Sequence, residues 1–518
     1  MSKSLRSTIR RCLVTMLALT LCLTGLMVYA AAEEAPLKFT ITYSDNPTLP
    51  FKQDWLVITE ANKLWNLDAT WEVIPNMDYN TKVLAELGTN TTYDVIMYLS
   101  PTAGEAANLA LGGAMAPISD YVEMGWTPHF SKCIEKWGMQ EELNQRRLSD
   151  GKYYFLPTLY DKPFFDGGLI LREDLLEEFG MAAPKTFDDL YAYLKACKER
   201  DPSCFPLTHL VAPYVTWRMS MPSWGFNVGR SAATGVAVLS WDYENKEYFA
   251  GAISEQYKAY FGWMAKLYAE GLLDPEFWPE GDMWATKMAT GAATVSYAYY
   301  DQIGGLVGNS EIEGIRFNMY PSLEGPYGAY HQPKARLGGG PVFTAAAQNR
   351  PDFERLVRAI DAMCYSDEAA VLWCLGVEGT TFYYDADGKV AFFDEALNSP
   401  DGVYKFLQVT YGCGADPSQQ VWINAQEMLK YDENYAAINA VVAEMNAIPL
   451  IPPSPVLSED NAERASMLAM PLRDLFETWT DHFIIGEKDL DADWDTYVAE
   501  MQAIGIDEIC QIYNDSRR

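Results

Sequence analysis

The stretch FDGGLILREDLLEEFGMAAPKTFDDLYAYL, residues 165–194, combines the signals of a strand, a helix, a turn and a second helix. The apolar run at residues 168–171 predicts a buried strand, and Asp174 is predicted to cap the short helix that follows. Thr186 and Asp189 have the spacing of a capping box, which predicts the start of the second helix. This combination indicates an α/β fold, and by itself it does not indicate a chemical activity.

The N-terminal part of the chain alternates between strands and helices in the same way. Residues 37–44 alternate in hydrophobicity, as a half-buried strand does, and residues 53–65 are predicted to be helical. Residues 70–74 predict a second strand, and the unbroken apolar run at residues 95–99 predicts a strand buried on both faces. This order favours a parallel sheet with right-handed crossovers.

A stripe of large side chains marks the longest helix that the sequence predicts, at residues 254–270. Tyr257, Phe261, Met264 and Tyr268 recur at helical spacing, and we interpret this stripe as core packing rather than as a ligand site. Two further helices are predicted near the end of the chain, at residues 493–503 and 507–513. The absence of a short repeat or a long linker favours lobes that are built against each other.

The first thirty residues have the pattern of a secretory signal peptide. A basic head with four Lys or Arg precedes a mostly apolar segment, and Val28, Tyr29 and Ala30 fit a cleavage site. The whole chain of 518 residues has a net charge of −32, so removal of residues 1–30, which contain no acid, leaves −36. Nucleic acid and anionic membranes are therefore poor partners, and we expect an exported, extracellular or cell-surface-associated protein.

Seven cysteines remain after residue 30, at irregular spacing. Cys197 could pair with Cys204, or Cys364 with Cys374, in an exported protein, but buried free thiols are an equally good interpretation. No two of them have the spacing of a metal or redox motif.

Signatures of enzymes are scarce in the sequence. There is no HExxH, GxSxG, GxGxxG or P-loop motif, and the segment DADGKV at residues 385–390 favours a hairpin turn over a calcium loop. A carboxylate pair for glycoside hydrolysis cannot be chosen among 71 acidic residues. We expect no cofactor and no metal, because the histidines lack ligand spacing: they are His129, His209, His331 and His482.

Four ordered segments resemble a known family. They are LILREDLLEEFGMAAPKTFDDLYAYLKACKERDP, KLYAEGLLDPEF, YSDEAAVLWCLGVEGTTFYYDADGKV and FIIGEKDLDADWDTYVAEMQAIGIDEICQIYNDS. The chain resembles the extracellular solute-binding proteins of family 1, especially the branch that serves oligosaccharide and uronide importers. This resemblance implies a two-lobe, type II periplasmic-binding-protein fold with ligand held in the cleft. It also implies delivery to the permease subunits of an ABC transporter and no catalytic activity.

Two departures and a domain division follow from the resemblance. Many relatives have a calcium-like loop after the Asp-Pro pair, whereas Ser203 follows Pro202 here, so no metal is predicted. Many relatives are lipoproteins, but the bulky Leu21 precedes Cys22, which disfavours a lipid anchor. By family pattern, residues 36–163 with 335–400 would form the first lobe, and residues 164–334 with 401–518 the second.

The candidate ligand contacts are polar and aromatic residues that follow predicted strands or lie in loops, with one acid from a family segment. Sugar rings have apolar faces that pack on aromatic side chains, and ligands of α/β proteins bind beyond the carboxyl ends of strands. For any single residue of this set, packing is an equally good interpretation. The set is Tyr43, Asp45, Trp55, Ser100, Asp161, Phe164, Asp166, Trp217, Arg218, Trp224, Tyr299, Tyr300, Asp301 and Glu378.

The favoured hypothesis is a monomeric receptor that captures an oligosaccharide and closes around it. An acidic sugar would need basic residues such as Arg218 or Arg336, whereas a neutral sugar would depend on the tryptophans. The sequence does not decide against a peptide or a lipid as the ligand. The alternatives are a secreted carbohydrate-active enzyme that uses paired carboxylates, and a surface scaffold, for which the expected repeats and wall-anchoring tail are not found in the sequence.

Overall fold

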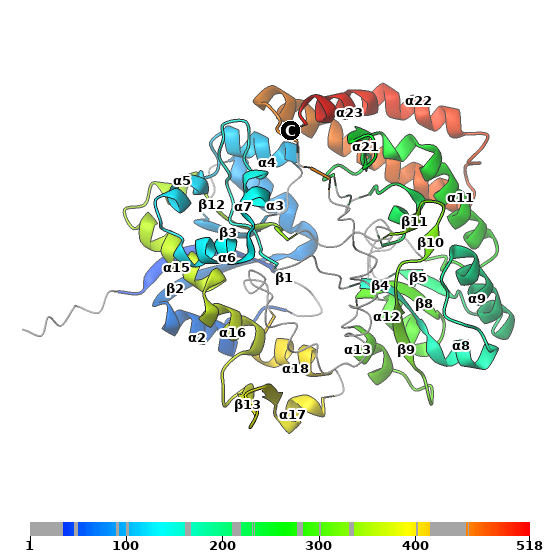
Figure 1. The fold of residues 1–518 in the computed structure, drawn as a ribbon, viewed down its shortest axis with the longest axis horizontal. Coiled ribbons are helices and arrows are strands. Elements are labelled where there is room, and N and C mark those ends of the chain that lie inside the picture. The colour runs from blue at the N-terminus through cyan, green and yellow to red at the C-terminus, as the bar shows by residue number, and fades with distance from the viewer. Residues whose placement is uncertain are drawn as a thin grey trace, which may run out of the picture.

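Two four-stranded sheets organise the computed structural model of the chain, each with its own covering helices (Figure 1). No helix in the described part of the chain is both long enough and apolar enough to cross a membrane. The structure describes residues 35–45, 50–89, 93–99, 103–160, 167–209, 219–229, 232, 234–276, 283–299, 302–330, 336–399, 402–414, 452–453 and 455–517.

The first sheet has the strand order β12-β3-β1-β2. Its strands are β1 (Leu37–Asp45), β2 (Leu67–Pro75), β3 (Val95–Leu99) and β12 (Gly340–Phe343). β1 pairs in parallel with β2 and β3, which confirms the predicted parallel sheet, whereas β12 returns from far along the chain and pairs antiparallel with β3. Its helices are α2 (Leu56–Leu64), α3 (Asn76–Gly88), α4 (Ala103–Leu111), α5 (Ile118–Glu123), α6 (Pro128–Trp137), α7 (Gln140–Asn144), α14 (Ala345–Gln348), α15 (Phe353–Tyr365), α16 (Asp367–Leu375), α17 (Asp394–Leu397) and α18 (Gly402–Tyr411).

The second sheet has the order β5-β8-β4-β9 and mixes parallel with antiparallel pairs. Its strands are β4 (Gly167–Arg172), β5 (Leu207–His209), β8 (Val295–Tyr299) and β9 (Phe317–Tyr320). The helices of this half are α8 (Glu173–Phe179), α9 (Phe187–Arg200), α11 (Glu255–Ala269), α12 (Met283–Thr290), α13 (Ile303–Gly308), α21 (Glu459–Ile485), α22 (Trp494–Ile504) and α23 (Ile506–Asp515), with the 3₁₀ turns η2 (Met221–Trp224) and η3 (Gly251–Ile253).

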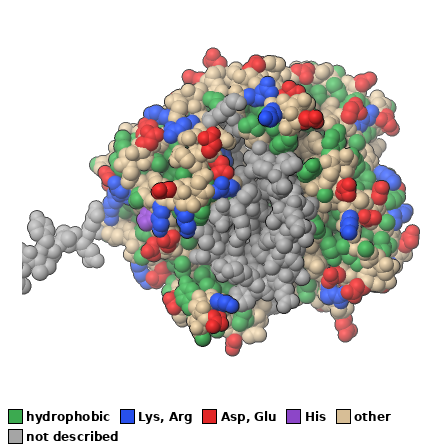
Figure 2. Space-filling model, in the orientation of Figure 1, with side chains coloured by type: hydrophobic (Ala, Val, Ile, Leu, Met, Phe, Trp, Pro, Cys, Tyr) green, Lys and Arg blue, Asp and Glu red, His purple; other side chains and the backbone are tan. Residues whose placement is uncertain are grey.

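Three two-stranded hairpins complete the fold. They are β6 (Ser240–Asp242) with β7 (Glu247–Phe249), β10 (Glu324–Gly325) with β11 (Gly328–Ala329), and β13 (Phe382–Tyr384) with β14 (Val390–Phe392). The last of these confirms the hairpin turn that DADGKV predicted. Acidic and basic side chains are interspersed over the described surface of both halves (Figure 2).

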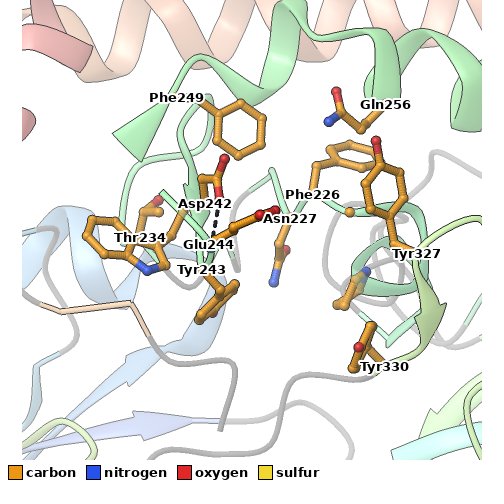
Figure 3. Close-up of a pocket in the computed structure, with 13 residues that line it drawn as sticks. Phe226, Asn227, Thr234, Asp242, Tyr243, Glu244, Phe249, Gln256, Tyr327 and Tyr330 are labelled. Atoms are coloured by element: carbon orange, nitrogen blue, oxygen red, sulfur yellow. Dashed lines mark hydrogen bonds between the residues drawn. The ribbon is translucent and has the colours of Figure 1, made fainter. Parts of the chain in front are cut away.

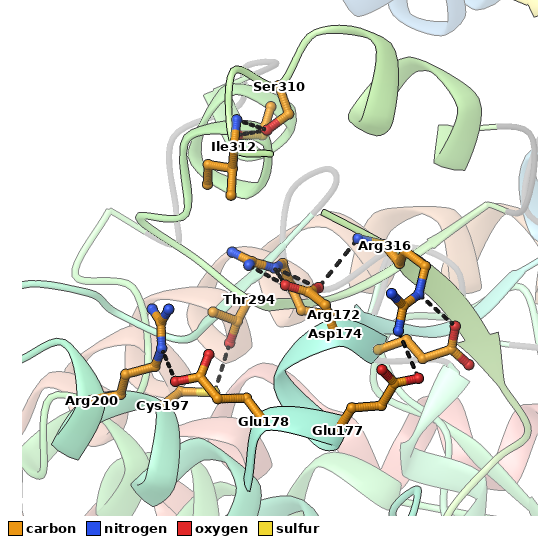
Figure 4. A network of polar contacts seen from close by, with 12 residues as sticks. Arg172, Asp174, Glu177, Glu178, Cys197, Arg200, Thr294, Ser310, Ile312 and Arg316 are labelled. Atoms are coloured by element: carbon orange, nitrogen blue, oxygen red, sulfur yellow. Dashed lines mark hydrogen bonds and ion pairs between the residues drawn. The ribbon is translucent and has the colours of Figure 1, made fainter. Parts of the chain in front are cut away.

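The segment that decides the fold forms β4, α8 and α9 as expected, with one correction. Thr186 and Asp189 make a reciprocal capping box at the start of α9. Asp174, however, does not cap α8, because its carboxylate accepts hydrogen bonds from the Arg172 side chain and from the Arg316 amide (Figure 4). Burial raises the pKa of Asp174, but these hydrogen bonds outweigh burial and hold the pKa below its usual value.

Two large cores lie around the two sheets. The first contains side chains from residues 37–159 together with residues 337–413, and the second contains side chains from residues 169–323 together with residues 457–513. Leu407 and Cys413 therefore pack with the first sheet, although the sequence grouped residues 401–518 with the second lobe. The division into two discontinuous lobes remains a prediction.

The 27-residue helix α21 was missed by the sequence analysis. Ala465, Leu468, Leu472, Phe476 and Phe483 have helical spacing and are buried, so the signal was present in the sequence. The helix packs on α11 and α23, and also on α4, whose Ala107 belongs to the second core. α21 therefore joins the second half to an element that follows β3 of the first sheet.

All seven cysteines after residue 30 are free thiols in the structure. Burial raises the pKa of Cys133 and of Cys197 to about 11, so very little thiolate forms at neutral pH. We expect a thiol reagent at pH 8 to react slowly with the native protein and to count seven thiols once the protein, without residues 1–30, is unfolded. A count of five in the unfolded, unreduced protein would instead indicate one disulfide.

Candidate functional site

A pocket of about 390 Å³ lies in the second half of the molecule, beside the β6–β7 hairpin. Three segments form its walls: the loop after η2, the β6–β7 hairpin, and the β10–β11 hairpin with Tyr330, which follows it. Gln256 in the first turn of α11 completes the lining. Figure 3 shows Tyr243 and Glu244 on one side and Tyr327 and Tyr330 on the other, with Asn227 between them.

The β6–β7 hairpin has a turn that Asp242 stabilises. Its carboxylate accepts hydrogen bonds from the amides of Glu244 and Asn245, at 2.8 and 2.9 Å, and from the Asn245 side chain at 2.8 Å. The bond from the Asn245 amide is the main reason that the pKa of Asp242 lies below its usual value. The turn thereby presents an ionised carboxylate, with Tyr243 and Glu244 beside it, to the pocket.

The opposite wall is held in place by Ser223. Its hydroxyl donates a hydrogen bond to the Tyr330 carbonyl and accepts one from the Tyr330 amide, both at 3.0 Å. The Ser223 carbonyl accepts a hydrogen bond from the Tyr327 amide at 3.1 Å. The Tyr327 ring lies on Gly225, where an added Cβ would be 2.8 Å from the ring, and Gly225 also has a positive φ of 84°. Glycine at this position therefore lets the tyrosine ring lie against the backbone.

The remaining lining side chains combine apolar and amide groups. Trp241 and Phe249 are half-buried, and Trp241 packs edge to face on the buried Tyr248 with ring centroids 4.8 Å apart. Ser240 fixes the backbone of Asn227, since its hydroxyl donates to the Asn227 carbonyl and accepts from the Asn227 amide, both at 2.9 Å. The pocket thus presents aromatic faces next to groups that donate and accept hydrogen bonds, which is the composition of a site for a small polar ligand.

The structure places three of the candidate residues together at the end of β1. The Tyr43 and Phe51 rings lie 4.7 Å apart, and Phe51 packs on Trp55 at 5.6 Å. Trp55 is only 2% exposed and donates its indole N–H to the Val409 carbonyl, so it is a core residue. Asp45, the last residue of β1, accepts a hydrogen bond from the Phe51 amide.

Three other candidates lie apart from that group. Trp224 packs against the rings of Phe187 and Tyr260 rather than into the pocket, although its neighbours in the loop line it. Tyr299 ends β8 and packs at the edge of the second core. Glu378 is exposed and lines a different pocket between α2 and α16. None of these placements tests ligand contact, which remains a prediction for each residue.

The other candidates lie outside the described residues, so their predicted roles stay predictions. They are Ser100, Asp161, Phe164, Asp166, Trp217, Arg218, Tyr300 and Asp301.

The sequence analysis selected none of the described side chains that line the pocket. A signal existed: aromatic residues flank an Asp-initiated turn in WDYENKEYF, residues 241–249, and tyrosines flank glycine in GPYGAY, residues 325–330. The sequence analysis predicted no strand directly before either segment, so the rule that selected candidates by strand ends passed over both.

Two arginines of the first half bear on the charge of a bound ligand. Arg336 donates to both carboxylate oxygens of Glu142, at 3.1 and 3.2 Å, and to the Trp137 carbonyl. Arg146 donates to the Leu337 carbonyl and lies 6.0 Å from the Phe155 ring centroid, and burial lowers its pKa. Among the described residues, no carboxylate pairs with Arg146, and no group of three or more acidic, Cys or His side chains is placed to hold a metal ion.

His209 ends β5 and is 7% exposed, and burial lowers its pKa to about 4. The unfolded chain binds a proton near pH 6.5, so acid favours unfolding, and this group should cost about 2 kcal/mol of stability between pH 8 and pH 5. We expect His209→Gln to reduce the pH dependence by about that amount in urea titrations at both pH values. An unchanged pH dependence of stability in His209→Gln would contradict the assignment of this effect to His209.

These features define a two-lobe solute-binding protein: two α/β halves, each around its own sheet, with an aromatic and polar pocket. The model of the family described as bacterial extracellular solute-binding protein matches residues 57–352, more than half of the chain, and the chain belongs to this family. The family consists of non-catalytic solute-binding proteins of ABC transporters, which confirms the expectation from the sequence.

Individual relatives share only a modest part of their sequence with this chain. The chain is 28% identical over 147 residues to the polygalacturonan/rhamnogalacturonan-binding protein YtcQ of Bacillus subtilis, which is 28% of this chain and 27% of the relative. It is 23% identical over 328 residues to lipoprotein LipO of the same organism, 61% of each chain. The crystal structure of an alginate-binding protein, AlgQ2, superposes with a TM-score of 0.76 at 17% identity, covering 93% of this chain and 98% of that one, and confirms the fold.

Proposed function

We propose that this protein is the extracellular receptor of an ABC importer and that it captures an oligosaccharide. The pocket carries the proposal, because aromatic side chains line it together with hydroxyl, amide and carboxylate groups. Sugar rings present apolar C–H faces to aromatic rings and hydroxyl groups to polar side chains. The polygalacturonan-binding and alginate-binding names of two similar proteins support the same class of ligand.

Capture would proceed without covalent chemistry. The open and closed arrangements of the two lobes are in equilibrium, and a ligand that contacts both lobes shifts the population to the closed form. The permease subunits would recognise that form, and the receptor would act as a monomer. Candidate residues at the ends of β1, β3 and β8 would supply contacts beyond the pocket. Export by residues 1–30, and association with the cell surface like that of the lipoprotein relative, belong to the same proposal.

Titration of the protein without residues 1–30 tests the receptor function directly. Tryptophan fluorescence and calorimetry would be measured against a panel of neutral and uronic-acid oligosaccharides, while chromatography follows any product. We expect saturable binding with a Kd of about 1 μM or tighter for at least one saccharide, and no turnover. Cleavage of a panel member would replace the receptor with a secreted enzyme, and no binding across the panel would exclude these carbohydrate ligands.

A further inference from the structure

We propose that the pocket beside the β6–β7 hairpin is a subsite for a neutral sugar ring and that it disfavours a uronic acid at the same position. This inference rests on the proposed capture of an oligosaccharide and goes further by naming the charge of the sugar unit. It stands on the two carboxylates and on the tyrosine rings that the two walls of the pocket present.

The carboxylates of Asp242 and Glu244 exclude a negatively charged unit. Both line the pocket from the same turn, and three hydrogen bonds hold the Asp242 side chain in place. A uronate carboxylate bound between the walls would face two like charges, which disfavours its binding. A neutral ring avoids this repulsion, and its hydroxyl groups can donate to the same oxygens.

The tyrosine rings provide the apolar surface for the ring. Tyr327 rests on Gly225, and the Tyr330 ring lies against Gly328, where an added Cβ would be 2.9 Å from the ring. Because Ser223 fixes the backbone of both tyrosines, little further ordering is needed when a sugar binds. Pre-ordered aromatic faces opposite hydrogen-bonding groups suit a hexose unit, which has an apolar face and a polar edge.

No Lys or Arg is among the described residues that line the pocket, which agrees with a neutral ligand there. Arg336, which the sequence suggested for an acidic sugar, is already paired with Glu142 in the first half of the molecule. Arg146 also belongs to the first half and does not line the pocket in the described part of the chain.

Matched saccharides that differ only in charge test the inference. The probes are β-1,4-mannotriose against β-1,4-trimannuronate, and α-1,4-galactotriose against α-1,4-trigalacturonate, together with the tightest neutral ligand of the wider panel. Calorimetry should show tighter binding to the neutral member of a pair. Tyr327→Ala should weaken neutral binding about tenfold, whereas Tyr327→Phe should keep it. Tyr384→Ala, an exposed tyrosine of the β13–β14 hairpin, is the matched control and should change nothing.

Reversal of one charge gives a second, independent readout. Glu244→Lys should strengthen binding of the uronate trisaccharides about tenfold at low salt and less at high salt. Glu247→Lys makes the same change of net charge on the same hairpin, but Glu247 is exposed on β7 and does not line the pocket, so uronate binding should stay as in the wild type.

The outcomes separate the subsite from the receptor function. Tighter binding of the uronate than of the matched neutral trisaccharide by the wild type would overturn the neutral subsite and leave a carbohydrate receptor. If Tyr327→Ala left the affinity for the neutral saccharides unchanged, the ligand would bind elsewhere and the proposed neutral subsite would be overturned. Failure of every saccharide to bind would remove the proposed function itself, and the subsite with it.

Discussion

Replacement of Asp274 by alanine should lower the free energy of unfolding by about 3–5 kcal/mol. Asp274 is 3% exposed, and its carboxylate accepts hydrogen bonds from Lys287 at 2.8 and 3.0 Å and from the Thr208 hydroxyl at 2.8 Å. These contacts join β5 to α12, so the variant would leave the Lys287 ammonium and a buried hydroxyl without their main acceptor. Urea denaturation followed by circular dichroism would measure the loss.

Glu276→Ala is the matched control for this prediction. Glu276 also pairs with Lys287 at 2.8 Å, but its side chain is 69% exposed, so solvent already screens the pair. The control should have nearly the wild-type unfolding midpoint. Equal losses in the two variants would contradict the view that burial, rather than the ion pair as such, makes Asp274 important.

Replacement of Asp361 by alanine should cost about 2–4 kcal/mol of stability, because two backbone donors lose a buried acceptor. The carboxylate of Asp361, on α15, is fully buried and accepts from the amides of His129 and Phe130, at 3.0 and 2.8 Å, in the first turn of α6. Those amides have no acceptor within their own helix. Burial raises the pKa of Asp361, and the two amide bonds oppose this rise. Denaturant titration at pH 7 would measure the effect.

Asp367→Ala tests whether buried hydrogen bonds to the α6 amides, or any negative charge near α6, stabilise the protein. Asp367 lies on α16 and pairs with Lys132 of α6 at 2.9 Å, with a side chain that is 80% exposed. Its loss should leave the unfolding midpoint nearly unchanged. If Asp367→Ala proved as damaging as Asp361→Ala, the attraction between α6 and negative charge in general, and not the buried amide bonds, would explain both results.

The predicted elements and the observed ones agree best where the signal is local. The strand at residues 95–99 is observed as β3, and the capping box of Thr186 and Asp189 starts α9, because both depend on neighbouring residues alone. The prediction for Asp174 was wrong because the Arg172 side chain, two residues away, and the Arg316 amide, 142 residues away, both donate to its carboxylate. The fold class and the solute-binding family were both predicted correctly from the sequence.

The packing of the candidate aromatic residues could not be predicted from the sequence, because aromatic residues serve both cores and ligand sites. Tyr43, near the end of β1, and Trp55, after it, met the selection rule, and both pack with Phe51 in the first core. Tyr327 met no rule, and it reaches the pocket only because Gly225 leaves room for its ring. Local sequence does not distinguish an aromatic residue that packs in a core from one that lines a pocket, since contacts between distant segments decide which aromatic face stays exposed.

The sequence by itself determined the α/β class, the capping of α9, the parallel order of the first three strands and the family. These follow from periodicity, turn chemistry and ordered motifs, which act over a few residues or are shared between relatives. Only the tertiary structure decided that β12 completes the first sheet and that residues from several separate segments line one pocket. The physical reason is that burial and ring packing depend on which distant residues meet, and the free energy of those contacts is not encoded in any one segment.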